Sequence, residues 1–303
     1  SIHPESKSVT VKNLETGTVF TERYDKLLLS PGAKPIKPNL DGVDSDKIFT
    51  LRTVEDTLKI KNYTNAHQPE SAVVVGGGFI GIEVAENLRN LGINVTLVEA
   101  AEQLMNPFDG DMASFIHAEM RKNGINLMLN TMVEGFSETD HGIDVKIKNA
   151  SAIHTDMVVM AIGVLPETTL AKEAGLELGI KGSIVVNDRM ETSVPDIYAA
   201  GDAVQVKHFV TGQDTLLSLA GPANKQGRIA ADNIAGVASE YGGSQGSAVL
   251  KIFDMTAATT GLNEKSAAAA GIDYDKAYTY SASHASYYPG GANMSVKALW
   301  DKK

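Results

Sequence analysis

The sequence contains no cysteine and only one tryptophan in 303 residues. Without a thiol it can form no disulfide, no thiolate metal site and no cysteine nucleophile within these residues. Its apolar runs are far shorter than the roughly 20 residues that span a bilayer. Basic residues are also fewer than acidic ones: the sequence has 27 basic and 37 acidic residues, for a net charge of −10. We therefore expect neither a membrane span nor a nucleic-acid partner.

The usual signatures of metal and hydrolase sites are missing as well. The seven histidines show no i, i+4 pairing, the spacing that would place two imidazoles on one helical face to bind a metal. Ser218 lacks the strand-turn-helix context of a nucleophile elbow. We expect no metal site and no serine hydrolase.

The composition, 43% hydrophobic and 21% charged, is that of a globular protein long enough for two or three domains. The N-terminus shows no secretory signal, so we expect a cytoplasmic location. Residues Val9 to Lys12 already read as a strand, and Met294 to Trp300 read as another just before the end. We expect the sequence to be a fragment that lacks both termini of its protein.

A strand, glycine turn, helix and second strand follow one another from residue 73. The buried strand 73–75 leads into glycines, and the apolar residues of 80–91 recur at helical spacing before Gly92. Residues 95–98 then read as a strand, which predicts a βαβ unit with parallel strands.

Further elements follow this unit. We expect a helix capped by Asp111, a strand at 125–129, antiparallel strands over 132–155 and a buried strand at 157–162. Later we expect a strand ending at Ala200, a helix over about 223–235, and a C-terminal α+β region with strands at 248–253, 276–280 and 294–300.

The strongest chemical signal is the segment Gly76 to Gly81, a G-x-G-x-x-G motif between strand and helix. Gly76 allows the tight turn, Gly78 lets the backbone approach a pyrophosphate, and Gly81 lets the helix pack on the strand. Glu99 ends the next strand, where an acid accepts hydrogen bonds from ribose hydroxyls, and no arginine follows for a 2′-phosphate. The pattern favours NADH, and the alternative is a glycine turn that binds nothing.

A second signal is Gly201-Asp202 at the end of a strand. On its own this is a common turn. It is joined by Pro31-Gly32 upstream and by Gly163 between them, in the segment Ala161 to Pro166. These motifs, in this order, resemble the pyridine nucleotide-disulfide oxidoreductase family over nearly the whole chain.

The resemblance implies an α/β fold with two interleaved Rossmann-like dinucleotide-binding domains, each of three ββα layers, and a C-terminal α+β dimerisation domain. An FAD-binding domain would comprise residues 1–57 and 166–242, with its first glycine motif ahead of Ser1. An NAD-binding domain would be inserted at 58–165, and residues 243–303 would form the dimerisation domain.

The resemblance also assigns residues to the two cofactors. The NADH site would use Gly76, Gly78, Ile80, Gly81 and Glu99, and Phe79 would cover the flavin until nicotinamide displaces it, or else simply pack between helix and sheet. Glu83 would reach the nicotinamide amide, or be a solvated acid favoured by the helix dipole. The FAD site would be formed by residues Pro31, Gly32, Gly163, Gly201, Asp202, Ala220 and Ala223. The helix that begins near residues 221–223 would direct its positive end at the reduced flavin.

Two segments, 219–227 and 284–290, resemble the branch of the family with a single redox cysteine. That branch contains coenzyme A-disulfide reductases, NADH-dependent persulfide reductases, NADH oxidases and NADH peroxidases. It implies that Tyr288, and with less support Tyr287, acts catalytically in the partner subunit's active site, the alternative being interface packing. The redox cysteine would lie upstream of residue 1.

We therefore expect an FAD- and NADH-dependent homodimeric oxidoreductase that reduces coenzyme A disulfide or a related persulfide. An NADH oxidase or peroxidase is the second interpretation. A third is a cysteine-independent ferredoxin or rubredoxin reductase. A fourth is a module that binds NAD and catalyses nothing.

Overall fold

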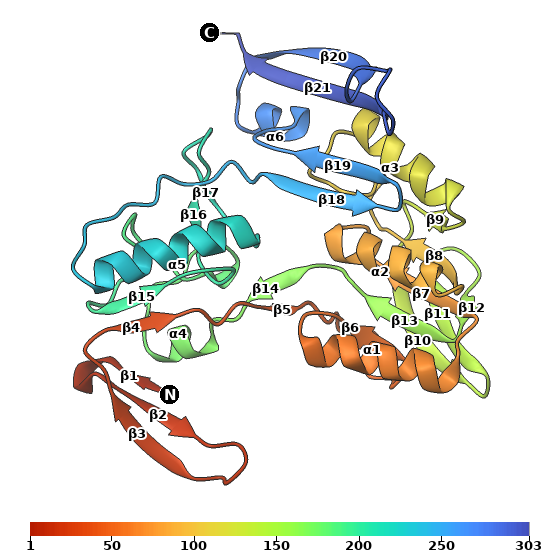
Figure 1. The fold of residues 1–303 in the computed structure, drawn as a ribbon. Coiled ribbons are helices and arrows are strands. Elements are labelled where there is room, and N and C mark those ends of the chain that lie inside the picture. The colour runs from red at the N-terminus through yellow and green to blue at the C-terminus, as the bar shows by residue number, and fades with distance from the viewer. Residues whose placement is uncertain (303) are drawn as a thin grey trace.

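The computed structural model describes residues 1–302 and is built around a five-stranded parallel sheet (Figure 1). The strand order is β6-β13-β7-β8-β9, with the bounds Ile48–Thr50, Met157–Met160, Ser71–Val75, Asn94–Val98 and Asn126–Met128. Every neighbouring pair in this sheet is parallel. The predicted βαβ unit is therefore confirmed, because β7 and β8 are adjacent.

Three helices accompany this sheet: α1 (Val54–His67), α2 (Phe79–Asn90) and α3 (Gly110–Lys122). Thr53 caps α1 in a capping box with Asp56, which satisfies backbone N–H groups at the start of the helix. The N-cap of α3 is Asp109, so the predicted cap at Asp111 is wrong, and Asp111 lies in the first turn.

The sheet is covered on both faces, which gives the predicted three layers. In β7, Ala72 and Val74 pack with α2 and α3, whereas Val73 and Val75 pack with an antiparallel sheet on the other face. This alternation follows from the period of two along a strand. The covering sheet consists of β10 (Val133–Thr139), β11 (Gly142–Ile147) and β12 (Ile153–Thr155).

A second unit is formed by segments from both sides of the first in sequence. Its parallel strands β4 (Leu27–Leu29) and β15 (Ile197–Ala199) pair directly. Its other elements are β1 (Ile2–His3), η1 (Pro4–Ser6), β2 (Ser8–Lys12), β3 (Val19–Arg23), α4 (Thr169–Glu173), η2 (Ile180–Gly182), β16 (Val206–Lys207), β17 (Asp214–Thr215) and α5 (Ala220–Ile234). Its own core includes residues from both segments, such as Ile2 and Ile197. The two units are thus interleaved, as predicted.

A short antiparallel pair, β5 (Ala33–Pro35) with β14 (Val164–Pro166), connects the units where the chain leaves and re-enters them (Figure 1). Strand β6 belongs to the large sheet, so this sheet begins before the boundary predicted at residue 58. The exact domain limits stay a prediction.

The C-terminal region contains β18 (Ala248–Ile252), β19 (Met255–Thr259), α6 (Glu264–Ala269), β20 (Tyr274–Ala282) and β21 (Asn293–Asp301). The β18–β19 hairpin packs over α2, and Ile252 joins the core of the large sheet (Figure 1). Glu86 of α2 is buried, and its carboxylate accepts the backbone N–H of Phe253 at 3.0 Å and pairs with Lys251 at 3.1 Å. Among residues 1–302, no helix combines the length and hydropathy needed to cross a membrane.

Candidate functional site

The glycine motif lies at the carboxyl edge of the large sheet, between β7 and α2. Gly76 has φ +109°, and a Cβ there would lie 2.4 Å from the carbonyl oxygen of Ala161 in the neighbouring chain segment. A Cβ on Gly81 would lie 1.9 Å from the carbonyl oxygen of Gly76. Only glycine therefore allows this turn and this close approach of helix to strand.

The N-terminus of α2 faces open space. Gly78 is the N-cap, it is exposed, and a Cβ built on it would meet nothing within 4 Å. Among the described residues 1–302, no side chain caps this helix, so its first N–H groups are available to an anion. Phe79 and Ile80 are partly buried and pack against the core of the sheet.

Glu99 follows β8 and is bound to the glycine motif. Its Oε2 accepts the backbone N–H of Gly77 at 2.6 Å, and its Oε1 accepts the N–H of Ala101 at 2.7 Å. These two bonds orient the carboxylate beside the turn. No lysine or arginine occurs in residues 100–106, so the segment supplies no cation for a second phosphate.

Glu83 lies one turn into α2, and its pKa is raised by partial burial of the carboxylate and by the negative charge of Glu86. Its backbone carbonyl accepts a hydrogen bond from the Asn87 side chain. An acid with a raised pKa near a helix N-terminus takes up a proton more readily than a free one.

A second set of residues at strand ends, Pro31-Gly32 and Gly201-Asp202, lies in the other unit. Because β4 and β15 are parallel neighbours, Pro31-Gly32 and Gly201-Asp202 leave the same edge of their sheet. The Asp202 carboxylate, whose side chain is 14% exposed, pairs with the Arg52 guanidinium at 2.7 Å. Arg52 Nε also donates to the carbonyl of Ala33 at 3.1 Å. Arg52 therefore holds both loops together.

Arg52 was not among the predicted site residues. It lies between β6 and the N-cap of α1, in the first unit, and its partner Asp202 is 150 residues away in sequence. No spacing rule connects two such positions. The only local sign is an arginine at a strand-to-helix junction.

Helix α5 contacts the turn at Gly201-Asp202 through a side chain. The side chain of Gln226, which is buried, accepts the backbone N–H of Gly201 at 2.7 Å. Gln226 was also missed, because an isolated glutamine in a helix carries no chemical signal. Ala220 begins this helix and Ala223 lies in its first turn, and no side chain in the described part of the chain caps its N-terminus.

Gly163 lies in sequence between the glycine motif and Gly201. It follows β13 with φ +115°, and its carbonyl accepts the N–H of Ile36 at 2.9 Å. This bond adjoins the β5–β14 connection, so Gly163 belongs to the junction of the two units.

Tyr287 and Tyr288 lie in the loop between β20 and β21. They are 81% and 61% exposed, and their ring centroids are 4.8 Å apart. Figure 1 shows this hairpin at the end of the molecule away from β4 and β15. Within residues 1–302, neither tyrosine makes a hydrogen bond or ring contact with the strand-end groups described above.

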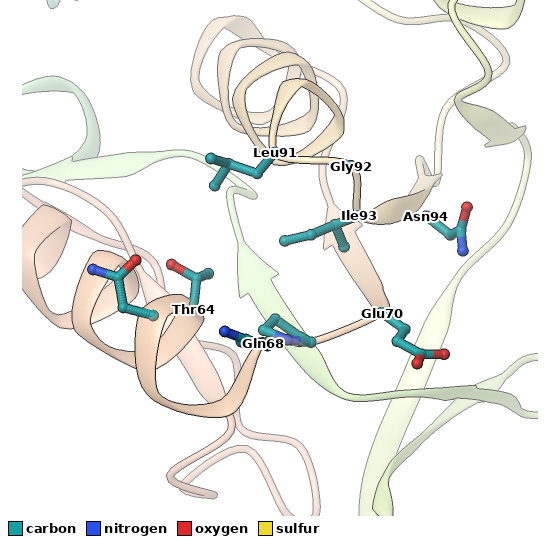
Figure 2. Close-up of a pocket in the computed structure, with 9 residues that line it drawn as sticks. Thr64, Gln68, Glu70, Leu91, Gly92, Ile93 and Asn94 are labelled. Atoms are coloured by element: carbon teal, nitrogen blue, oxygen red, sulfur yellow. The ribbon is translucent and has the colours of Figure 1, made fainter.

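A surface pocket of about 520 Å³ lies between the ends of α1 and α2, near Gln68, Gly92 and Asn94 (Figure 2). Asn94 begins β8, so the pocket lies at the amino edge of the sheet. Ligands of open parallel sheets bind at the carboxyl edge. The pocket is thus on the opposite side from the glycine motif. Residues 1–302 contain no cluster of three or more histidine or acidic residues placed to hold a metal.

Two interleaved units, each with glycine turns at the carboxyl ends of parallel strands, have the architecture of paired Rossmann-like dinucleotide-binding domains. The family model described as pyridine nucleotide-disulphide oxidoreductase matches residues 1–227. The chain belongs to this family, which confirms the resemblance seen in the motifs.

Three similar proteins illustrate the match. The structure of reduced Bacillus anthracis CoADR-RHD matches with a TM-score of 0.96 and 47% identity. The match covers 99% of this chain and 54% of the chain in that structure. An NADH oxidase of Methanocaldococcus jannaschii is 37% identical over 99% of this chain and 67% of its own length. A coenzyme A disulfide reductase of Staphylococcus aureus is 34% identical over 99% of this chain and 67% of its own length. The chain thus spans about two thirds of these curated relatives and about half of the solved structure.

Proposed function

We propose that this chain is the FAD- and NADH-binding part of a homodimeric enzyme that reduces coenzyme A disulfide or a related persulfide. The observation that carries the proposal is the pair of strand-end sites in two interleaved units, joined by the ion pair of Arg52 with Asp202. In the overall reaction NADH gives up a hydride, the S–S bond breaks, and a proton completes two thiols.

The residues at the glycine motif fit NADH. The N–H groups that begin α2 would bind the pyrophosphate, and the open space at Gly78 admits it. Glu99 would accept hydrogen bonds from the ribose hydroxyls, since its carboxylate is already oriented beside the turn. Phe79 would lie at the nicotinamide end, one residue into the helix, with Glu83 a turn further on.

The residues at Asp202 fit the later part of an FAD site. Asp202 would accept hydrogen bonds from flavin hydroxyls, held in place by Arg52, while the turn at Gly32 lies beside it. Ala220 and Ala223 lie in the uncapped first turn of α5, and this helix would direct its positive end at the flavin. Bound FAD supplies a ring that accepts a hydride from NADH and releases two electrons to an acceptor.

The acceptor is proposed from the relatives and from the tyrosine pair. The name of the S. aureus relative is coenzyme A disulfide reductase, and the exposed Tyr288, with Tyr287 beside it, would reach the active site of the partner subunit. A redox cysteine, which these 303 residues do not contain, would carry the sulfur chemistry. The NADH oxidase relative favours dioxygen as the second candidate acceptor.

The C-terminal region supports the homodimer. Met294, Val296 and Trp300 alternate along β21 on one face and are 40–49% exposed. An exposed apolar row of this kind on a two-stranded sheet is typical of an interaction surface. We also propose a cytoplasmic location, because an NADH-dependent thiol-producing reaction suits a reducing compartment.

The test is cofactor binding followed by acceptor stoichiometry. FAD titrated into the full-length apoenzyme should bind, as followed by flavin fluorescence, and Asp202→Ala should weaken binding by about tenfold or more. Asp214→Ala is the control, since Asp214 forms a surface pair with Lys207 in the same unit. Equal flavin affinity in wild type and Asp202→Ala would contradict the FAD assignment.

The full-length enzyme, assayed without oxygen, should form two thiols for each NADH consumed when coenzyme A disulfide is added. Tyr288→Phe should slow this turnover and leave flavin reduction by NADH unchanged. NADH consumption that occurs only with dioxygen would replace the disulfide interpretation by the oxidase one.

A further inference from the structure

The segment between β8 and α3, residues 99–109, folds back over the glycine motif. The backbone N–H of Met105 donates to the carbonyl of Gly77 at 2.9 Å. Leu104 is fully buried, and a Cβ on Gly77 would lie 2.3 Å from its Cδ2. Gly77 thus donates its N–H to the Glu99 carboxylate, accepts the N–H of Met105 at its carbonyl, and lies against the side chain of Leu104.

A histidine of α3 holds this segment from outside. The Nε2 of His117 accepts the backbone N–H of Leu104 at 3.0 Å. An accepting ring nitrogen carries no proton, so this bond requires neutral imidazole with its hydrogen on Nδ1. Leu104 has no strand or helix partner for its N–H, because it lies between β8 and α3.

The surroundings keep the imidazole neutral. Partial burial and the positive charge of Arg121, one turn further along α3, lower the pKa of His117. The charged residues of the segment itself are Glu99, which binds Gly77 and Ala101, Glu102, and Asp109, which pairs with Lys297. Protonation of His117 would place an N–H against the N–H of Leu104 and break the bond.

We propose that His117 is a positioning residue for the adenosine-ribose end of NADH. Through Leu104 and Met105 it holds the turn at Gly77, and with it the carboxylate of Glu99 that would bind the ribose. The inference rests on the proposed NADH site but not on FAD, on the disulfide substrate or on the dimer. It is therefore testable by NADH binding alone.

The experiment compares the NADH affinity of three variants with wild type from pH 8 to pH 5, by nucleotide fluorescence. His117→Leu removes the acceptor and should weaken NADH binding by about tenfold at pH 8. His117→Gln places an oxygen where Nε2 lies, so it should bind within about threefold of wild type. Wild type should lose affinity as the pH falls and His117 is protonated, and His117→Gln should lose less.

The matched control is His208→Leu. His208 lies in the other unit, its Nδ1 accepts the N–H of Val210 at 3.3 Å, and burial lowers its pKa as well. This variant should leave both the NADH affinity and its pH dependence unchanged.

The outcomes separate the two proposals. If the wild-type chain binds no NADH, the proposed function fails and this inference fails with it. If wild type binds and His117→Leu binds equally well, only the inference is refuted. Should His117→Leu fail to fold, as judged by circular dichroism, His117→Gln decides. If His117→Gln binds NADH more than about threefold more weakly than wild type, or loses as much affinity as wild type when the pH falls, the role of Nε2 is refuted.

Discussion

Replacing Lys297 by methionine tests what attaches the C-terminal region to the large sheet. The side chain of Lys297 is 4% exposed, and its Nζ lies 2.9 Å from Asp109 and 2.8 Å from Asp111. It also contacts the carboxylate of Glu264. Asp109 and Asp111 belong to the start of α3, so one buried cation bridges β21, α6 and α3.

The size of the effect follows from burial. Removing one partner of a buried ion pair costs about 3–5 kcal/mol, because the charges left behind are poorly solvated. Asp111 is 41% exposed and can rehydrate, so we expect a loss near the lower limit, about 3 kcal/mol. Although burial opposes the charge of Lys297, hydrogen bonds with these carboxylates raise its pKa. The side chain is therefore charged throughout the usual pH range.

The assay is urea unfolding followed by tryptophan fluorescence. Trp300 is the single tryptophan of the chain and lies on β21, near Lys297, so it reports the release of this hairpin. A loss of about 3 kcal/mol lowers the midpoint by about 1 M urea or more. Lys276→Met is the control, because Lys276 is exposed and pairs with the same Glu264. Equal midpoints for the two variants would refute the bridging role of Lys297.

Acid should weaken the same attachment. Hydrogen bonds with Lys276 and Lys297 lower the pKa of Glu264 from 4.5 to about 2. A carboxyl group with a depressed folded-state pKa stabilises the fold above its unfolded pKa, and this contribution is lost as the pH falls from about 4.5 towards 2. The Trp300 signal should therefore show hairpin release in that range, and a stability independent of pH there would contradict the assignment.

Two further variants test the glycine motif and the acid beside it. Gly81→Ala places a methyl group against the Gly76 carbonyl, so it should destabilise the chain by roughly 1–3 kcal/mol and weaken NADH binding. Gly227→Ala in α5, where a Cβ meets nothing, is the matched control, and equal effects would exclude the steric reason. Glu99→Arg should weaken NADH binding by about tenfold or more and relax discrimination against NADPH. An unchanged cofactor preference, with Glu102→Arg as the control, would remove Glu99 from the ribose site.

Much of the fold was predictable because its strongest determinants are local. The continuous apolar runs at 73–75 and 157–162 predict strands that are buried on both faces, and the strands found there, β7 and β13, do lie inside the sheet. The glycine motif was recognisable because it requires specific residues within six positions. The antiparallel strands over 132–155 were visible from their alternation.

The supporting residues could not be predicted in this way. Arg52, Gln226, His117 and Lys297 each act on a partner that only the tertiary structure places within reach. Arg52 and Asp202 are 150 residues apart in sequence, and nothing in the spacing of either residue indicates the other. Their pairing depends on how two separate sheets are set against each other.

The amino-acid sequence by itself determined the parallel strands, the glycine turn and the acid that follows it, because backbone sterics and side-chain periodicity act over a few residues. Only the tertiary structure decided which side chains orient those groups, since ion pairs and hydrogen bonds depend on distances of about 3 Å between chain segments that the sequence keeps far apart.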